Sequence, residues 1–298
     1  MNASRCGYVA LIGAPNAGKS TLLNRLVGQK LAIVTPKAQT TRNRLLGIAI
    51  AGTAQMIFVD TPGIFTPRRR LDRAMVAAAW AGAEDADMTV LLVDAARGID
   101  RDTRHILDRL ALRRRRAILA LNKIDLVRRD SLLGLADRLS REGDFEPVLM
   151  ISGLNGDGVE DLKSHLAENL PTGPWLFPED QLSDAPMRMI AAETTREQVF
   201  LQLQQELPYA STVETEAWEE RRDGSVRIDQ IIYVERPSQR AIVLGDGGAR
   251  IKAIGARARA ELERALERRV HLFLFVKVRE RWGEDRDRFA ALGLDYDV

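Results

Sequence analysis

The sequence predicts an α/β fold: a P-loop NTPase domain with a doubly wound, mostly parallel sheet, followed by a smaller α+β domain. Short aliphatic runs alternate with helical segments through the first 170 residues, which is typical of buried parallel strands. A glycine loop follows the first run and opens a helix. After residue 170 the expected order is a helix, two strands, a helix pair around a glycine turn and a final strand at 270–278.

Several runs are expected to form the parallel strands of the first sheet, namely residues 8–12, 56–59, 88–93, 117–121 and 148–151. Residues 45–50 are expected to add an antiparallel edge strand, because only an Ala-Gly-Thr connection separates them from the next run. Ligands of such a sheet bind at the carboxyl ends of its strands.

The 298-residue chain is long enough for two domains. We expect a nucleotide-binding domain at 1–170, a linker at 171–185, a second domain at 186–285 and a C-terminal tail at 286–298. The single cysteine, Cys6, allows no internal disulfide and favours a reducing compartment. The longest uncharged run has fifteen residues, short of the roughly 20 of a spanning helix, so neither a leader nor a membrane span is expected. The expected location is the cytoplasm.

The glycine loop has the spacing of a phosphate-binding P-loop. It consists of Gly13, Ala14, Pro15, Asn16, Ala17, Gly18, Lys19 and Ser20, with Thr21 next in the helix as a further expected nucleotide contact. Its two outer glycines let backbone N–H groups face the β-phosphate. Lys19 is expected to reach the β- and γ-phosphates, and the Ser20 hydroxyl to ligate Mg2+. A chance glycine turn is the alternative, but further segments agree with a nucleoside triphosphate site.

One of these segments ends the strand at 56–59. It consists of Asp60, Thr61, Pro62 and Gly63. The Asp60 carboxylate can hold Mg2+ through a water, and the Gly63 N–H can approach a γ-phosphate that a side chain would block. Between the P-loop and Asp60, the segment 37–42 has two threonines that could supply a second Mg2+ ligand, and we favour Thr41 over Thr40. Lys19, Thr41 and Gly63 are the expected catalytic residues.

The segment that ends the strand at 117–121 predicts the base. The Asp125 carboxylate can accept two hydrogen bonds from the ring N–H and exocyclic amine of guanine, a donor pair that adenine lacks. The stem of Lys123 would lie along the base, and Asn122 would connect this loop to the P-loop. Ser152 and Gly153 end the next strand, where a backbone N–H would meet the guanine carbonyl. The expected ligands are therefore GTP and GDP.

The second domain carries a pattern for single-stranded RNA. Residues 242–255 are expected to form a strand, a GxxG loop and the start of a helix. The expected RNA contacts are Gly245, Asp246, Gly247, Gly248, Arg250, Ile251 and Lys252. Residues 237–281 hold 11 basic and 5 acidic residues, a difference of +6, whereas residues 175–235 hold 5 basic and 13 acidic residues, a difference of −8. An anionic partner is therefore expected at the later stretch.

The first 170 residues resemble a translation-factor-class GTPase domain, and the whole chain resembles the Era family, in which a type II KH domain follows the GTPase. Segments beyond the general motifs carry this resemblance: KAQTTR at 37–42, ELPY at 206–209, IIYVER at 231–236, and VKV at 276–278 followed by Trp282. The resemblance implies a monomeric GTP-hydrolysing switch that binds small-subunit ribosomal RNA near its 3′ end and assists small-subunit assembly. It also implies some peripheral contact with the cytoplasmic face of the cell inner membrane.

Four positions add to this resemblance or depart from it. Ile64 stands where glutamine-activated GTPases carry the glutamine that positions the attacking water. Its side chain has no polar atom, which implies slow GTP hydrolysis. The backbone, K+ or the bound ribosome would then align the water. Asn16 matches the asparagine that helps to hold K+ in potassium-dependent relatives. Asp246 puts a carboxylate where basic or amide residues are common, and Gly153 replaces the alanine of the Ser-Ala motif.

Two other functions are alternatives to this one. A metabolic or RNA-modifying enzyme that merely uses a P-loop would need a second catalytic constellation, and the sequence shows no CxxC, nucleophile–His pair or carboxylate dyad with suitable spacing. A membrane-peripheral cell-cycle regulatory GTPase with incidental RNA affinity stays open as the alternative.

Overall fold

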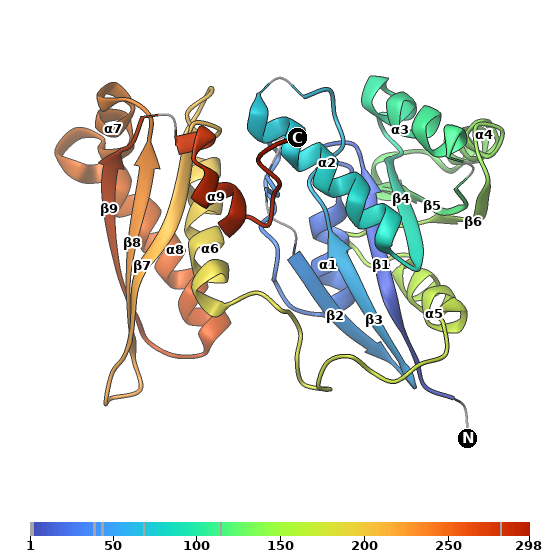
Figure 1. Cartoon of the computed structure of the whole chain (residues 1–298), viewed down its shortest axis with the longest axis horizontal. Helices are drawn as coiled ribbons and strands as arrows, with labels where there is room; N and C mark the ends of the chain where they lie inside the picture. The colour runs from blue at the N-terminus through green and yellow to red at the C-terminus, as the bar shows by residue number, and fades with distance from the viewer. Residues whose placement is uncertain (1–2, 38–39, 43–44, 68, 114, 281) are drawn as a thin grey trace. The chain divides into compact units, whose positions relative to one another are not determined.

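The computed structural model describes residues 3–37, 40–42, 45–67, 69–113, 115–280 and 282–298. Ala38 and Gln39, in the expected switch segment at 37–42, lie outside the described residues. By packing, the chain divides into two units, each shown in Figure 1. The first comprises Met1–Ala32, Thr41–Asp184 and Phe289–Val298, and the second Ile33–Thr40 and Ala185–Arg288. These units differ from the contiguous ranges expected from the sequence at three places: 33–40, the expected linker at 171–184, which belongs to the first unit, and the C-terminal end.

The first unit contains a six-stranded sheet with the order β2-β3-β1-β4-β5-β6 (Figure 1). Its strands are β1 (Arg5–Gly13), β2 (Leu45–Ala51), β3 (Ala54–Asp60), β4 (Met88–Asp94), β5 (Ala117–Asn122) and β6 (Phe145–Met150). β2 is antiparallel to β3, and the other neighbours are parallel. The predicted parallel strands and the antiparallel edge strand are therefore confirmed. β1, β3, β4 and β5 are buried along most of their length, which explains their nearly continuous apolar runs.

Helices enclose this sheet. They are α1 (Lys19–Val27), α2 (Arg70–Asp85), α3 (Arg101–Leu112), α4 (Arg129–Ser140) and α5 (Val159–Asn169), with a 3-10 turn at Ile124–Leu126. α2, α3 and α4 bury Trp80, Leu107 and Leu135 in one shared core. α1 and α5 contact each other and both contact β2 and β3. The carboxyl ends of the parallel strands are left for the loops that carry the candidate site.

The segment expected as a linker is hydrogen-bonded along the edge of this sheet. Gln55 of β3 is fully buried and accepts hydrogen bonds from the amides of Leu176 (2.9 Å) and Phe177 (3.1 Å). It also donates to the Phe177 carbonyl over 2.8 Å. Farther along, the Ile48 amide of β2 donates to the Leu182 carbonyl over 2.8 Å. The segment thus satisfies main-chain groups that an edge strand would otherwise leave unpaired.

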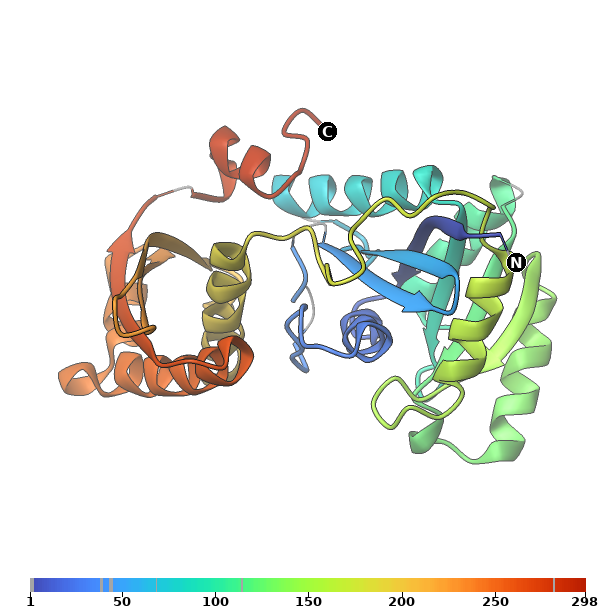
Figure 2. The same ribbon diagram turned by 90° about the horizontal axis from the view of Figure 1, so that it is seen from below.

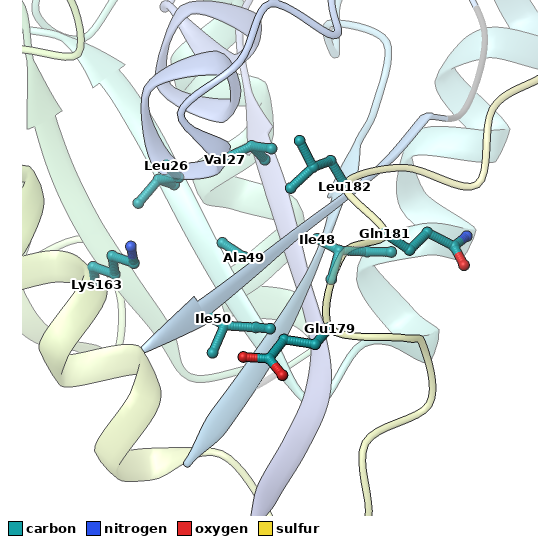
Figure 3. Close-up of a pocket in the computed structure, with 9 residues that line it drawn as sticks. All are labelled: Leu26, Val27, Ile48, Ala49, Ile50, Lys163, Glu179, Gln181 and Leu182. Carbon is teal, nitrogen blue, oxygen red and sulfur yellow. The ribbon is translucent and has the colours of Figure 1, made fainter. Parts of the chain in front are cut away.

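A small cavity lies where this segment crosses β2 (Figure 3). Its walls include the apolar Leu26, Ile48 and Leu182 and the charged Lys163 and Glu179. Its volume of about 130 Å³ is below the roughly 300–1,000 Å³ of small-molecule pockets. We therefore assign it no ligand.

The second unit is a three-stranded sheet with helices. Its strands, in the order β7-β8-β9, are β7 (Ser211–Glu220), β8 (Val226–Val234) and β9 (Val270–Val278). Its helices are α6 (Met187–Gln202), α7 (Pro237–Leu244) and α8 (Ala249–Leu266), with 3-10 turns at Asp246–Gly248 and Trp282–Glu284. The division of the chain into units falls within α9 (Arg286–Ala291), after Arg288. α6 and α8 pack against the sheet (Figure 2) around Val199, Ile254 and Val276. β9 runs parallel to β8, as the helical crossover between them allows.

The strand expected at 242–244 is wrong. These residues form the last turn of α7. Pro237 occupies the first turn of that helix, and the Gln239 side chain accepts hydrogen bonds from the amides of Glu235 (2.9 Å) and Arg236 (3.0 Å). A run of three apolar residues does not by itself distinguish a strand from a helix, and the helix start signal lies five residues earlier.

The longest helix among the described residues, α8, has 18 residues and carries several charges. Within the part of the chain that the structure describes, no helix combines the length and apolar character that a membrane span requires.

Candidate functional site

The P-loop connects β1 to α1, and its backbone requires glycine at two positions. Gly13 has a φ of 155°, and a Cβ there would lie 2.5 Å from the Leu92 carbonyl oxygen. Gly18 has a φ of 99°, and a Cβ there would lie 2.2 Å from Asn122 Nδ2. A side chain at either position would clash or strain the backbone. The loop can therefore present its N–H groups at the N-terminus of α1, where an anion is favoured.

A buried cation and a buried anion flank the loop. The Lys19 ammonium donates to the carbonyl oxygens of Gly13 (3.0 Å) and Ala14 (3.1 Å). Burial lowers the pKa of Lys19 to about 8, against the opposing effect of the Asp60 charge. Burial raises the pKa of Asp60 to about 6, opposed by Lys19 and by two hydroxyl groups. Both side chains are thus removed from water beside the loop.

Those hydroxyls come from two further segments. Ser20 Oγ lies 2.9 Å from Asp60 Oδ2 and 2.9 Å from Thr41 Oγ1, and Thr41 Oγ1 donates to Asp60 Oδ2 over 3.5 Å. Among the described residues, Asp60 Oδ1 is buried and has no hydrogen-bond partner. An orphaned buried oxygen beside two hydroxyls suits a hydrated Mg2+ ion, so the residues present fit this metal. The Thr40 hydroxyl instead donates to the Lys37 carbonyl over 2.8 Å.

The DTPG turn lies against the P-loop. Thr61 Oγ1 donates to the Leu11 carbonyl over 2.8 Å, and Pro62 follows it in the turn. A Cβ on Gly63 would lie 3.0 Å from the Pro15 Cα, closer than almost any side chain tolerates. Ile64 is 0% exposed and packs in the core of the unit. The side chain at position 64, directly after the turn, is therefore a buried hydrocarbon with no polar atom.

Asn122 connects three loops of the site. Its Nδ2 donates to the Ala17 carbonyl of the P-loop over 2.8 Å, and its Oδ1 accepts from the Gly153 amide over 2.9 Å. Asn122 is 2% exposed, so both hydrogen bonds are shielded from water. The structure thus brings the P-loop, the NKID segment and the turn at 152–153 together as the sequence led us to expect.

The other two residues of the NKID loop have partners from neighbouring strand ends. The exposed Asp125 accepts a hydrogen bond from Ser152 Oγ over 2.6 Å. Lys123 Nζ donates to Asp94 Oδ2 over 2.7 Å. Our sequence reasoning missed Asp94. The signal was available, because Asp94 ends β4 just as other site residues end their strands.

The GxxG loop joins α7 to α8 in the second unit. Gly245, Gly247 and Gly248 have φ values of 69°, 56° and 79°, which favour glycine. The Gly245 amide donates to the Ala241 carbonyl over 2.9 Å and ends α7. The loop therefore turns the chain directly into the N-terminus of α8.

The side chains around this loop differ in their contacts. Arg250 Nη1 donates to the Ile242 carbonyl over 2.8 Å and so caps the end of α7. Asp246 and Lys252 are exposed, and Ile251 is half-buried against the core of the unit. The exposed charged side chains of the loop and of the first turn of α8 are thus one carboxylate, Asp246, and two cations, Arg250 and Lys252.

Comparison with known proteins identifies the family. Residues 8–123 match the family described as 50S ribosome-binding GTPase, and residues 206–283 match the KH domain family. GTPase Era of Rhizobium meliloti (strain 1021) is 61% identical over 293 residues, which are 98% of this chain and 94% of the relative. The chain belongs to the Era family of GTPases.

Further Era proteins agree over the whole length. GTPase Era of Bradyrhizobium diazoefficiens is 59% identical over 294 residues, 99% of this chain and 96% of that protein. A point variant of Aquifex aeolicus Era bound to GDP.AlF4- matches at a TM-score of 0.91 and 36% identity, covering 97% of this chain and 99% of that one. The Era resemblance and the fold class are confirmed, and this Era-family chain is a GTP-hydrolysing enzyme.

Proposed function

We propose that this chain is a slow GTP-hydrolysing switch that binds small-subunit ribosomal RNA near its 3′ end and assists assembly of the small ribosomal subunit. One observation carries the proposal. A solved Era protein in complex with MgGDPNP and nucleotides 1506–1542 of 16S ribosomal RNA matches 97% of this chain at a TM-score of 0.92 and 36% identity. The match includes both the GTPase domain and the KH domain.

The P-loop, the DTPG turn, the NKID loop and the turn at 152–153 are the proposed GTP and GDP site. Lys19 would exchange its two carbonyl acceptors for the β- and γ-phosphates, and the backbone N–H of Gly63 would approach the γ-phosphate. Ser20, Thr41 and Asp60 would hold Mg2+, which is supported by the orphaned Asp60 Oδ1. The metal, when bound, neutralises charge on the phosphate oxygens. Lys19, Thr41 and Gly63 are the proposed catalytic residues.

Slow turnover is proposed because Ile64 has no polar atom with which to orient the attacking water. The backbone, K+ or the bound ribosome would have to align it. Asn16 is the proposed K+ residue, and its φ of 64° is a left-handed conformation that asparagine tolerates.

A salt comparison tests the K+ site. GTP hydrolysis is expected to be faster in KCl than in NaCl at equal ionic strength, and Asn16→Ala should lower the ratio of the two rates toward one. Equal rates of the unchanged protein in the two salts, measured as phosphate release, would discard the site.

The GxxG loop and the start of α8 are the proposed RNA site, with Asp246 weakening the attraction of the loop for phosphate. We also propose that the protein is a cytoplasmic monomer with some peripheral contact with the inner membrane. The alternative function, a membrane-peripheral cell-cycle GTPase with incidental RNA affinity, predicts that the main partner is a lipid membrane instead of the small ribosomal subunit.

Sedimentation with small ribosomal subunits or with anionic lipid vesicles separates these functions. At two salt concentrations, the protein loaded with a non-hydrolysable GTP analogue is expected to sediment with the subunits. Lys252→Ala should reduce this binding, because it removes an exposed cation beside the loop. Sedimentation with vesicles at both salt concentrations, and never with subunits, would instead favour the membrane function.

A further inference from the structure

Helix α6 buries an unusual run of polar residues, Thr194, Thr195, Arg196, Glu197 and Gln198. Such residues normally face water. One side of α6 packs on β7 and α8. The same packing unit also includes the segment Ile33–Thr40, which precedes Thr41 in the chain. The buried polar run therefore has partners on more than one side.

Arg196 binds the end of this segment. Its side chain is 1% exposed, and Nη2 donates to the Thr40 carbonyl oxygen. Nε donates to Glu193 Oε1 over 2.8 Å, and the guanidinium carbon lies 5.2 Å from the centroid of the Phe200 ring. Among the described residues, Nε and Nη2 of this guanidinium have hydrogen-bond partners, whereas the buried Nη1 has none. Loss of the Thr40 carbonyl would leave a second buried nitrogen with one acceptor fewer, so the contact favours one position of the Thr40 main chain.

Two further contacts hold the beginning and middle of the segment. Glu197, 3% exposed, accepts a hydrogen bond from the Val34 amide over 2.8 Å. Lys37 Nζ donates to the carbonyl oxygens of Phe200 and Leu203 at the C-terminal end of α6, where a cation is favoured. The segment is thus attached to α6 at three points along its length.

The next residue in the chain, Thr41, has its hydroxyl 2.9 Å from that of Ser20. We infer that Arg196 and Glu197 are positioning residues for GTP hydrolysis, because they hold the main chain at Thr40, the residue before Thr41, and at Val34. The inference rests on the proposed role of Thr41 as a Mg2+ ligand. The two family matches, 8–123 and 206–283, leave α6 outside both.

The physical basis is conformational entropy. A segment that is already attached has less freedom to lose when GTP and Mg2+ bind, so the attachment strengthens binding without touching the nucleotide. Detachment of the segment should therefore weaken only the binding of GTP with Mg2+, because that complex uses Thr41. Binding of GDP, which has no γ-phosphate, should be nearly unaffected.

The test compares variants of the full chain. Arg196→Ala and Glu197→Ala remove the two anchors, and Glu197→Gln keeps an oxygen that can accept the Val34 hydrogen bond. Gln198→Ala is the matched control, because Gln198 is equally buried on α6 but donates to Glu261 of α8 over 2.7 Å. Arg196→Lys is the milder variant if Arg196→Ala does not fold.

Three quantities are measured: amide hydrogen exchange of 31–41, the Mg2+ concentration that half-saturates binding of a non-hydrolysable GTP analogue, and kcat and KM for GTP. In the two anchor variants we expect faster exchange at Val34, an about tenfold higher Mg2+ requirement and an about tenfold lower kcat, with GDP affinity unchanged. Glu197→Gln should return the exchange rate at Val34, the Mg2+ requirement and kcat most of the way to their values in the unchanged protein. Gln198→Ala should alter none of these three quantities.

Faster exchange with an unchanged Mg2+ requirement and kcat would overturn the inference, since the attachment would then be only structural. Equal losses in Gln198→Ala would also overturn it. Thr41→Ala separates it from the proposed function. If Thr41→Ala lowers kcat and raises the Mg2+ requirement but the anchor variants do not, the inference alone is refuted. If Thr41→Ala changes neither quantity, the proposed role of Thr41 is refuted and the inference with it.

Discussion

The proposed guanine preference depends on one carboxylate held by a neighbouring hydroxyl. Asp125 is exposed, whereas Ser152, which donates to it over 2.6 Å, is 0% exposed. The buried serine therefore fixes one oxygen of Asp125 and limits rotation of its carboxylate. A fixed acceptor pair discriminates against a wrong base more strongly than a mobile one.

We expect Asp125→Asn to weaken GDP binding at least about 100-fold, because the amide would face guanine donors with a donor of its own. XDP, whose base has a carbonyl in place of the exocyclic amine, should then bind better than GDP. Calorimetry with the two nucleotides measures both effects. Asp137→Asn, an exposed carboxylate paired with Arg141 on α4, is the control, and unchanged GDP affinity of the Asp125 variant would refute the assignment.

At the scale of elements, two segments that the sequence presented as connections are parts of the packed first unit. The segment at 171–185 is hydrogen-bonded to β3 through Gln55 and to β2 through Leu46 and Ile48. The C-terminal segment buries Phe289 and Leu294, 1% and 6% exposed, in a cluster with Ala74 and Met75 of α2. Both therefore contribute to the stability of the unit that holds the nucleotide site.

Gln55→Ala should loosen the linker around Leu176 and Phe177. The variant removes three hydrogen bonds to the main chain of Leu176 and Phe177, and we expect a loss of about 1–3 kcal/mol in the free energy of unfolding of the first unit. Urea unfolding measures the loss, and limited proteolysis should show faster cleavage within 171–184. Gln181→Ala, which removes a single hydrogen bond to Ser183, should have a smaller effect on both. Unchanged cleavage would contradict the role of Gln55.

Phe289→Ala should release the C-terminal segment from α2. The ring of Phe289 packs edge-on against Tyr296 at 5.0 Å, and the Arg70 guanidinium of α2 lies 4.5 Å from the Tyr296 centroid. Because a terminal segment can detach, the loss of stability is limited to its docking free energy and should be smaller than that of a buried core phenylalanine. Hydrogen exchange in the first two turns of α2 should accelerate. Val298→Ala, at an exposed end residue, should change nothing, and unchanged exchange in the Phe289 variant would contradict the contact.

At the scale of the whole molecule, the proposed switch couples a nucleotide site in one packing unit to an RNA loop in the other. Such coupling is a free energy shared by both ligands, so it must be reciprocal. The segment Ile33–Thr40 packs with the second unit although its neighbours on both sides belong to the first. The chain therefore leaves the first unit before Ile33 and returns to it at Thr41, the expected Mg2+ ligand.

We expect a GTP analogue to raise the affinity for a 16S ribosomal RNA 3′ fragment, relative to GDP, by a factor within the roughly 5–150-fold range of allosteric couplings. The RNA should raise the affinity for the analogue, relative to GDP, by the same factor. The two ratios are compared by measuring four dissociation constants at one salt concentration: those of the RNA with the GTP analogue bound and with GDP bound, and those of the analogue and of GDP with the RNA bound. Equal RNA affinity in the two nucleotide states would show that the protein is not a switch.

The sequence by itself determined the elements whose signals are local. The strand expected at 270–278 has the bounds of β9, and the P-loop, DTPG and NKID segments all lie at strand ends, because alternation, glycine and strand termination are properties of neighbouring residues. The helix at 242–244 also has a local signal, Pro237 in its first turn, which lies outside the apolar run. Tertiary structure alone decided that Asp94 pairs with Lys123 and that Arg196 is buried against Thr40. Both contacts depend on groups distant in the chain. Burial of a charge is determined by its partners in space, and a single sequence does not show those partners.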